Sequence, residues 1–286
     1  MSATLSPVTT STGRVLPFDP TTLSMGKLLK EALENPGLLA TCYQKFHSYS
    51  LNNRLLVAVQ CHLRNLQPGP FAAYAAWQKL DRQVRKGERA LFILHPMFRK
   101  ETDETTGKET QRLVGFTYKA SAFVLSQTDG DDLDLAEKVP FDLQATLTEA
   151  RINCVPFEMT DGNCQGYAKP GRQISVSPIA AHPERTLFHE IGHVLLGHVD
   201  EKPAVDDETR NYSTGEVEAE AFSYLVCGML GIADDEISRS ESRGYIRYWM
   251  ENAPASDWSD KNVRRVFGAV DRFLGLTKKG DSTADA

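Results

Sequence analysis

The spacing of apolar residues changes from helical to strand-like in the first half of the chain. From Met25 the apolar residues recur three and four positions apart, which predicts a helix that ends at Asn35-Pro36-Gly37. After Gln67-Pro68-Gly69-Pro70 and one short helix, the period becomes two, with a hairpin tip expected near Thr106-Gly107. The expected elements are helices at 25–34, 38–66 (interrupted near 48–51) and 74–80, then strands at 83–86, 90–94, 112–119 and 122–126.

The second half of the chain returns to helical spacing after two short strands. The strands are expected at 165–169 and 173–177, and a helix follows that starts at His182-Pro183-Glu184 and ends at Gly197. Further helices are expected at 215–230, 242–250 and 260–274. This succession predicts an α+β fold of two domains, an α+β domain followed by a mostly helical domain with a small sheet.

The domain boundaries follow from changes in composition. Residues 1–24 are rich in Ser, Thr and Pro without periodicity, and we interpret them as a flexible arm. An acidic stretch at 131–140 is interpreted as a linker between a first domain at 25–130 and a second at 141–286.

Composition excludes several classes of protein. The 286 residues are 41% hydrophobic and 24% charged, as in ordinary globular proteins. No apolar run approaches the roughly 18 residues that a membrane span needs. The start of the chain lacks the pattern of a secretory signal, and the five cysteines are scattered without a CxxC pair. We therefore expect a cytoplasmic protein without a membrane partner.

The net charge of −6 conceals two parts of opposite sign. Residues 1–120 carry 16 Lys and Arg against nine Asp and Glu, a balance of +7, and the remainder carries −13. This asymmetry favours a basic module that meets a polyanion, although surface charge also drifts between domains without function.

Aromatic and cationic residues lie close together within the basic part. Single-stranded nucleic acid is bound by cations that follow the backbone and by aromatic rings that stack on bases. Alternatively, the aromatic residues belong to the core and the charges to a solvated face. The candidate DNA-binding residues are Asn53, Arg54, Trp77, Lys79, Arg82, Arg85 and Lys86.

The strongest chemical signal is an HExxH motif, His189-Glu190-Ile191-Gly192-His193, within a predicted helix. A spacing of four places both imidazoles on one helical face, where they can share a zinc ion. Glu190 lies about 100° around the helix from His189, which suits a general base that takes a proton from a water attacking a carbonyl. The alternative is a helix with two histidines that serve only the fold.

A catalytic zinc needs a third protein ligand. His198 follows the expected end of the helix, so we interpret it as a surface or rim residue. Glu216 and Glu220 share a helical face, whereas Glu218 points nearly opposite. We predict Glu216 as the ligand and Glu220 as the acceptor of a hydrogen bond from a ligand histidine. A capping box from Ser213 would occupy Glu216 instead and shift the ligand to Glu220.

The strand expected at 173–177 precedes the zinc-binding helix. It could form the exposed edge against which an extended peptide substrate pairs, or it could be an ordinary core strand.

Several strings of residues resemble one family. Three strings resemble the N-terminal domain of ArdC-type antirestriction proteins: Ser50-Leu51-Asn52-Asn53-x-Leu55-Leu56 followed by Gln60, Trp77-x-x-Leu80-x-Arg82-x-Val84-x-Lys86-Gly87-Glu88, and Phe123-x-x-Ser126-Gln127-Thr128. The resemblance continues through the HExxH motif and Glu216-Val217-Glu218-Ala219-Glu220 to Tyr245-Ile246-x-x-Trp249.

This resemblance implies a single-stranded-DNA-binding domain joined to a gluzincin-like zinc metallopeptidase domain. Such proteins belong to plasmids and other mobile elements and protect incoming DNA from host restriction. The implied metal ligands are His189, His193 and Glu216, with Glu190 as the base and an unidentified protein as substrate. Alternatives are a non-catalytic DNA-binding protein with a structural zinc and a peptidase that cleaves a regulator, as in the ImmA/IrrE type.

Overall fold

The structure is a computed structural model whose described residues fall into two compact units. The first unit combines residues 1–24 and 45–134, and the second combines 25–44 and 135–286. The described residues are 8–9, 15–16, 24–35, 37–39, 42, 49–102, 109–133, 141–159, 164–200, 212–232, 236–254 and 258–276.

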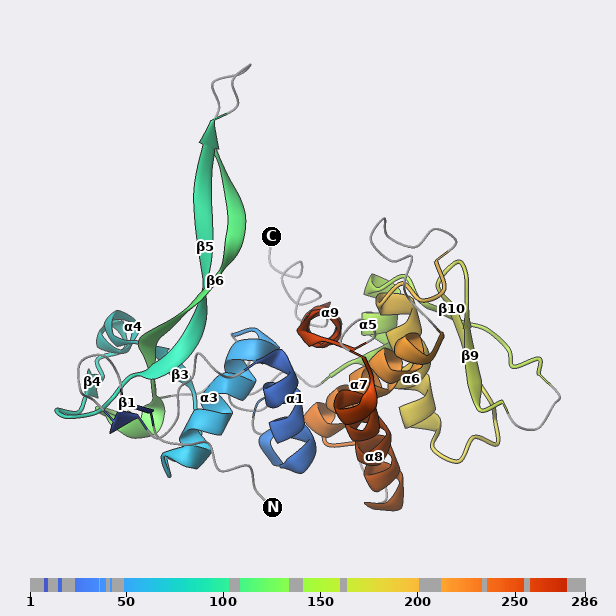
Figure 1. The fold of residues 1–286 in the computed structure, drawn as a ribbon, viewed down its shortest axis with the longest axis horizontal. Helices are drawn as coiled ribbons and strands as arrows, with labels where there is room; N and C mark the ends of the chain where they lie inside the picture. Colours follow the sequence, from blue (N-terminus) through green and yellow to red (C-terminus); the bar gives the residue numbers. More distant parts are fainter. Residues whose placement is uncertain are drawn as a thin grey trace. The chain divides into compact units, whose positions relative to one another are not determined.

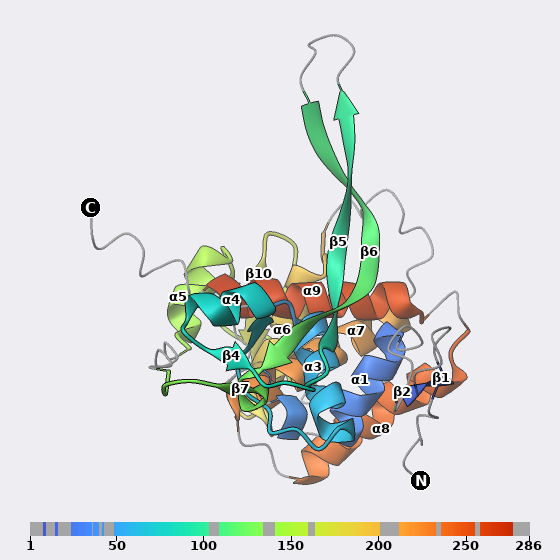
Figure 2. The ribbon, with the colours of Figure 1, turned by 90° about the vertical axis from the view of Figure 1, so that its left-hand side faces the viewer.

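The first unit is built on an antiparallel sheet with the strand order β3-β6-β5. Strands β5 and β6 continue past β3 as a long two-stranded ribbon (Figure 1), whose twist is visible in Figure 2. Its elements are α3 (Leu51–Leu63), β3 (Phe71–Ala73), α4 (Tyr74–Lys79), β4 (Gln83–Val84), β5 (Leu91–Thr102), β6 (Glu109–Val124) and β7 (Thr128–Asp129), with β4 paired to β7.

Helix α3 is buried along most of its length, and two of its buried residues are amides. Asn53 and Gln60 lie seven positions apart and therefore on one face of the helix. The Asn53 amide accepts from Leu94 N at 2.7 Å and donates to Leu94 O at 3.1 Å. The Gln60 amide makes the same pair of bonds with Phe92, both at 2.8 Å. Because β5 is an edge strand, these side chains satisfy backbone groups that no neighbouring strand reaches.

The second unit is mostly helical, with a small sheet of order β8-β10-β9. Strand β10 runs parallel to β8 and antiparallel to β9, and both β9 and β10 pack on α6. The elements are α1 (Met25–Glu34), α5 (Leu143–Glu149), β8 (Asn153–Cys154), β9 (Gly166–Lys169), β10 (Gln173–Val176), α6 (Pro183–Leu195), α7 (Tyr212–Leu230), α8 (Glu236–Asn252) and α9 (Asp260–Leu276).

Phe273 of α9 is a central residue of the core of the second unit. Its ring lies 5.6–5.9 Å from those of Phe141, Phe188 and Phe222, which come from the segment before α5, from α6 and from α7. These contacts bring the helices around α7 together and hold the HExxH helix in place.

Helix α1 belongs to the second unit, although we expected residues 25–130 to form one domain. It packs on α8 and α9, and its backbone N–H groups at Met25 and Gly26 donate to the Asp260 carboxylate at 3.2 and 2.9 Å. A carboxylate at a helix N-terminus satisfies N–H groups that lack an intrahelical partner.

The α+β class is confirmed, while several elements differ from expectation. The strands expected at 90–94 and 112–126 are parts of much longer strands, and the hairpin tip lies outside the described residues. Within 1–24, expected to be a flexible arm, β1 (Val8–Thr9) pairs with β2 (Val15–Leu16). None of the helices among the described residues has the length and apolar character needed to cross a bilayer.

Candidate metal centre

The HExxH motif lies in the second half of α6, where this helix packs closely against α7. Gly192 faces α7, and a Cβ atom there would lie 3.2 Å from both Ala219 Cα and Phe222 Cδ1. Glycine therefore permits the close approach that brings side chains of α7 to the two histidines.

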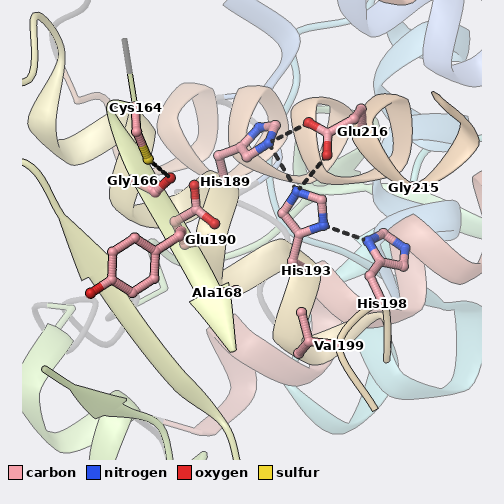
Figure 3. Close-up of a pocket in the computed structure, with 11 residues that line it drawn as sticks. Cys164, Gly166, Ala168, His189, Glu190, His193, His198, Val199, Gly215 and Glu216 are labelled. Atoms are coloured by element: carbon pink, nitrogen blue, oxygen red, sulfur yellow. Dashed lines mark hydrogen bonds and ion pairs between the residues drawn. The ribbon is translucent and has the colours of Figure 1, made fainter. Parts of the chain in front are cut away.

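His189, His193 and Glu216 point toward one another across this contact (Figure 3). The two histidine Nε2 atoms are 3.1 Å apart. The Glu216 oxygens lie 3.3 Å from His189 Nε2 and 3.4 Å from His193 Nε2. Tetrahedral ligands of zinc, each about 2.0–2.1 Å from the ion, are about 3.4 Å apart, so these residues fit one small cation.

The carboxylates of α7 differ in their positions relative to the two histidines. Helix α7 begins at Tyr212, so Ser213 lies inside the helix and does not precede it as the capping box requires. Glu216 is the carboxylate that groups with the two histidines. Glu220 lies one turn further on and accepts from His189 Nδ1 at 3.1 Å, while Arg185 donates to its other oxygen at 2.5 Å.

His198 lines the pocket beside His193 and is largely buried, so of our two expectations, a surface or a rim residue, only the second agrees with the structure. Its side chain is 6% exposed, and its Nδ1 lies 2.9 Å from Nδ1 of His193. Its Nε2 lies 2.9 Å from Glu218, whose side chain is fully buried on the face of α7 opposite Glu216. The sequence shows both residues, but helical periodicity gives no sign that the chain turns back after α6.

Glu190 is a buried carboxylate beside the three converging side chains. Burial raises the pKa of its carboxyl group above the usual range, with the two histidines opposing that effect. Within the described part of the chain, its carboxylate has no hydrogen-bond or ion-pair partner. Gly166 of β9 makes room for it, because a Cβ atom there would lie 3.0 Å from Glu190 Oε1.

The histidines and carboxylates of the site shift one another's pKa values toward the charged forms. Burial lowers the pKa of His189, but hydrogen bonds to Glu216 and Glu220 outweigh it and raise the pKa to about 9. Burial raises the pKa of Glu220, but His189 and Arg185 outweigh it and lower the pKa to about 2. The pKa of Glu216 is likewise low, because its bonds to both histidines outweigh burial.

A pocket of about 420 Å³ opens onto these side chains. Gly166, Tyr167 and Ala168 of β9 line it together with Glu190 and the histidines. Strand β9 is at the edge of its sheet, whereas β10 lies between β8 and β9. Of the two alternatives for residues 173–177, an exposed edge or an ordinary core strand, the structure shows the second, and the edge beside the pocket is β9.

Four of the seven candidate DNA-binding side chains are buried in the first unit. Asn53 binds the β5 backbone, Trp77 donates to Phe123 O at 2.9 Å, and Arg82 donates to Thr128 Oγ1 at 2.9 Å. Arg54 is only 5% exposed. The structure gives these residues contacts that hold the fold and does not gather them on the surface.

The other three candidates are exposed. Arg85 pairs with Glu88 at 2.9 Å and with Asp129 at 3.5 Å. Lys79 ends α4 and Lys86 lies in the turn after β4, and neither forms an ion pair with another described residue.

Comparison with known proteins divides the chain differently from the two compact units, since the matched region includes most of α1. Residues 29–123 match the family model of the N-terminal domain of anti-restriction factor ArdC. The fold is similar to the metal-free crystal structure of the antirestriction protein ArdC from plasmid R388, with a TM-score of 0.52 at 20% identity over 89% of this chain and 98% of that one. The Mn(II)-bound structure gives 0.53 at 18% identity, over 91% and 98%.

Two relatives share similarity in sequence. The uncharacterized protein y4eC of Sinorhizobium fredii is 24% identical over 217 residues, covering 70% of this chain and 68% of the relative. An uncharacterized protein of Bacillus anthracis is 22% identical over 84% of this chain, and the match spans 47% of that relative, about half its length. Residues 29–123 thus match the N-terminal domain family of ArdC, and the chain is similar in fold to the antirestriction protein ArdC.

Proposed function

We propose that this chain is an antirestriction protein of a mobile element, which binds single-stranded DNA and carries a zinc-dependent endopeptidase site. It would protect incoming DNA from host restriction in the cytoplasm. The observation that carries the endopeptidase assignment is the convergence of His189, His193 and Glu216 beside a buried Glu190 whose carboxylate has no partner among the described residues.

The three ligand residues leave room for a fourth ligand from the pocket. Two imidazoles and one carboxylate are the donor set of many catalytic zinc sites, and such sites keep one position open. The similar ArdC structure contains Mn(II), which supports a divalent cation at this site but does not identify it as zinc. When bound, the cation would polarise a carbonyl group and lower the pKa of a water molecule.

Glu190 would act as the general base. Burial raises the pKa of its carboxyl group, which makes the carboxylate a stronger base than an exposed one. It would accept a proton from the attacking water and deliver it to the leaving amine. A carboxylate that served only the fold would need a hydrogen-bonding partner to offset its burial, and none is present among the described residues.

Strand β9 would bind the substrate. Its edge beside the pocket has no partner strand among the described residues and offers backbone groups to an extended peptide, which can add to the sheet as a further strand. The substrate class is therefore an extended, exposed segment of a protein.

DNA binding is assigned to the first unit. The positive charge of residues 1–120 and the exposed Lys79 and Lys86 support it. We expect the double variant Lys79→Ala, Lys86→Ala to bind an oligonucleotide more weakly. The slope of log affinity against log salt concentration should become shallower by about two at most, because two cations that neutralise phosphates are lost. Lys261→Ala in the second unit is the control, and an unchanged salt slope in the double variant would place the DNA elsewhere.

The metal assignment is tested by elemental analysis of protein purified without added metal. Wild type and Glu190→Gln should each retain one equivalent of zinc, while Glu216→Ala should lose it. Protection of incoming DNA should fail in Glu190→Gln, because only the base is lost. Full protection by that variant with zinc still bound would favour the non-catalytic, DNA-binding alternative.

A further inference from the structure

We propose that His198 and Glu218 are positioning residues that hold His193 in the tautomer required of a metal ligand. This inference rests on the proposed metal site. Glu220 bonds directly to His189, whereas Glu218 would act on His193 through His198. We call the series His193, His198 and Glu218 the supporting arm.

The arm is a continuous series of hydrogen-bonded side chains. His193 Nδ1 lies 2.9 Å from His198 Nδ1, and His198 Nε2 lies 2.9 Å from a Glu218 oxygen. The other Glu218 oxygen accepts from Asn262 Nδ2 at 3.0 Å, with Arg265 at 3.5 Å. Figure 3 shows His198 on the side of His193 away from Glu190.

Only one proton arrangement satisfies this series with neutral imidazoles. An ionised carboxylate only accepts, so His198 Nε2 must donate to Glu218. His198 Nδ1 is then unprotonated and accepts, so His193 Nδ1 must donate to it. This leaves the lone pair of His193 Nε2 directed toward His189 and Glu216, where a cation would bind.

Burial gives the arm its strength. The Glu218 side chain is 0% exposed and that of His198 is 6% exposed. A carboxylate removed from water is costly unless its oxygens are bonded, and both Glu218 oxygens are. Helix α7 thus presents Glu216 and Glu220 to one side and, about 200° around from Glu216, Glu218 to the other.

The backbone after α6 places His198 in the arm. Gly197 has a φ of 71°, its N–H donates to Val194 O at 3.2 Å, and His198 N–H donates to His193 O at 2.9 Å. These bonds form a Schellman motif, which returns the chain beside its own last turn. Helix α7 passes directly beside the ring, since a Cβ atom at Gly215 would lie in van der Waals contact with His198 Nδ1, at 3.5 Å.

The test compares two substitutions in the full-length protein. A glutamine amide has one acceptor and one donor, so His198→Gln can accept from His193 and donate to Glu218, whereas His198→Leu can do neither. Zinc affinity is measured by competition with a chromophoric chelator. We expect His198→Leu to lose about 10–100-fold and His198→Gln to recover most of that loss.

Three outcomes overturn one claim each. If wild type binds no zinc, the metal site itself is wrong. If wild type binds and both variants bind equally well, the positioning role is wrong. If both variants lose affinity equally, the donor and acceptor pattern of His198 is irrelevant and the role is also wrong.

A second measurement needs no variant. Imidazole ¹⁵N shifts in the zinc-loaded wild type should show the proton on Nδ1 of His193 and on Nε2 of His198. The opposite assignment on either ring would refute the proton arrangement even if His198→Leu failed to fold.

Discussion

At the scale of single residues, Gly166 has a direct effect on the proposed base. A Cβ atom there would lie 2.7 Å from Thr186 Cγ2 and 3.0 Å from both Glu190 Oε1 and Ser175 O. One of these groups must move to accommodate a methyl group, and the carboxylate faces the open pocket.

We therefore predict that Gly166→Ala displaces Glu190. The free energy of unfolding should fall by about 1–3 kcal/mol, as for other overpacked sites, while zinc affinity stays unchanged. Urea unfolding and chelator competition measure the two effects. Gly244→Ala, in an open position on α8, is the control and should not destabilise. Unchanged stability in Gly166→Ala would show that the site accommodates a methyl group without strain, and the prediction would be wrong.

Glu88 gives the first unit a dependence on pH. Burial raises the pKa of its carboxyl group, but hydrogen bonds from Gln127 and Arg85 outweigh it, and the pKa lies below its ordinary value. A depressed carboxyl pKa contributes stability that is present above the unfolded pKa and is lost as pH falls through the folded one.

We predict that the stability difference between wild type and Glu88→Gln is constant from neutral pH to about pH 5 and shrinks below about pH 4.3. Urea unfolding at a series of pH values measures it. Glu109→Gln removes a carboxylate that is 64% exposed and serves as the control. If the stability difference instead grew below about pH 4.3, folding would raise the pKa of Glu88, and the lowered pKa assigned to it would be wrong.

The sequence was informative about residues whose roles depend on spacing along one helix. His189, Glu190 and His193 are related by helical geometry alone. The roles of His198, Glu218 and Gly166 depend on where the chain turns and which elements pack together, and periodicity does not encode these. The same limit explains why conspicuous residues such as Trp77 and Arg82 fitted a DNA surface by composition but lie buried.

At the scale of elements, the contact between α3 and β5 gives a structural role to two polar residues of the strings that resemble ArdC-type domains. Asn53 and Gln60 belong to strings that resemble ArdC-type domains, and each bonds both backbone groups of a β5 residue. Their amides substitute for a neighbouring strand along this edge.

We predict that Gln60→Met lowers the free energy of unfolding by about 1–3 kcal/mol, because the backbone N–H and C=O of Phe92 lose their partner in a buried setting. Hydrogen exchange should increase first along β5. Gln78→Met, on the exposed face of α4, is the matched control. Equal protection of β5 in both variants would mean that water satisfies these groups.

Sequence periodicity located most elements and misjudged their extent. Strands β5 and β6 exceed the expected segments because their outer parts are exposed on both faces, as Phe98 and Phe116 are, and show no alternation. The short α5 and β8 carry too few residues for a periodic signal. Helix α1 was found, but its place with α8 and α9 depends on contacts such as that with Asp260, which lies over 200 residues away.

At the scale of the whole molecule, the charge asymmetry corresponds broadly to the two compact units. The unit that contains the ribbon has 14 Lys and Arg against 11 Asp and Glu, whereas the unit with the proposed metal site has 18 against 27. Since each unit has its own core, a ligand of one should stabilise that unit first.

We predict that zinc at 100 times its dissociation constant stabilises the second unit by about 2.7 kcal/mol. Hydrogen exchange followed by mass spectrometry should show slower exchange in α6 and α7 and no change in β5 and β6. Glu216→Ala should show neither effect. Equal protection of both units in wild type would mean that they unfold as one.

The central claim is that Glu190 serves peptide-bond hydrolysis. The most direct test expresses wild type and Glu190→Gln in cells that receive single-stranded plasmid DNA and compares new protein N-termini by mass spectrometry. We predict cleavage products that appear with wild type and are absent with Glu190→Gln. Identical N-termini in the two samples, with the incoming DNA protected by both proteins, would contradict it.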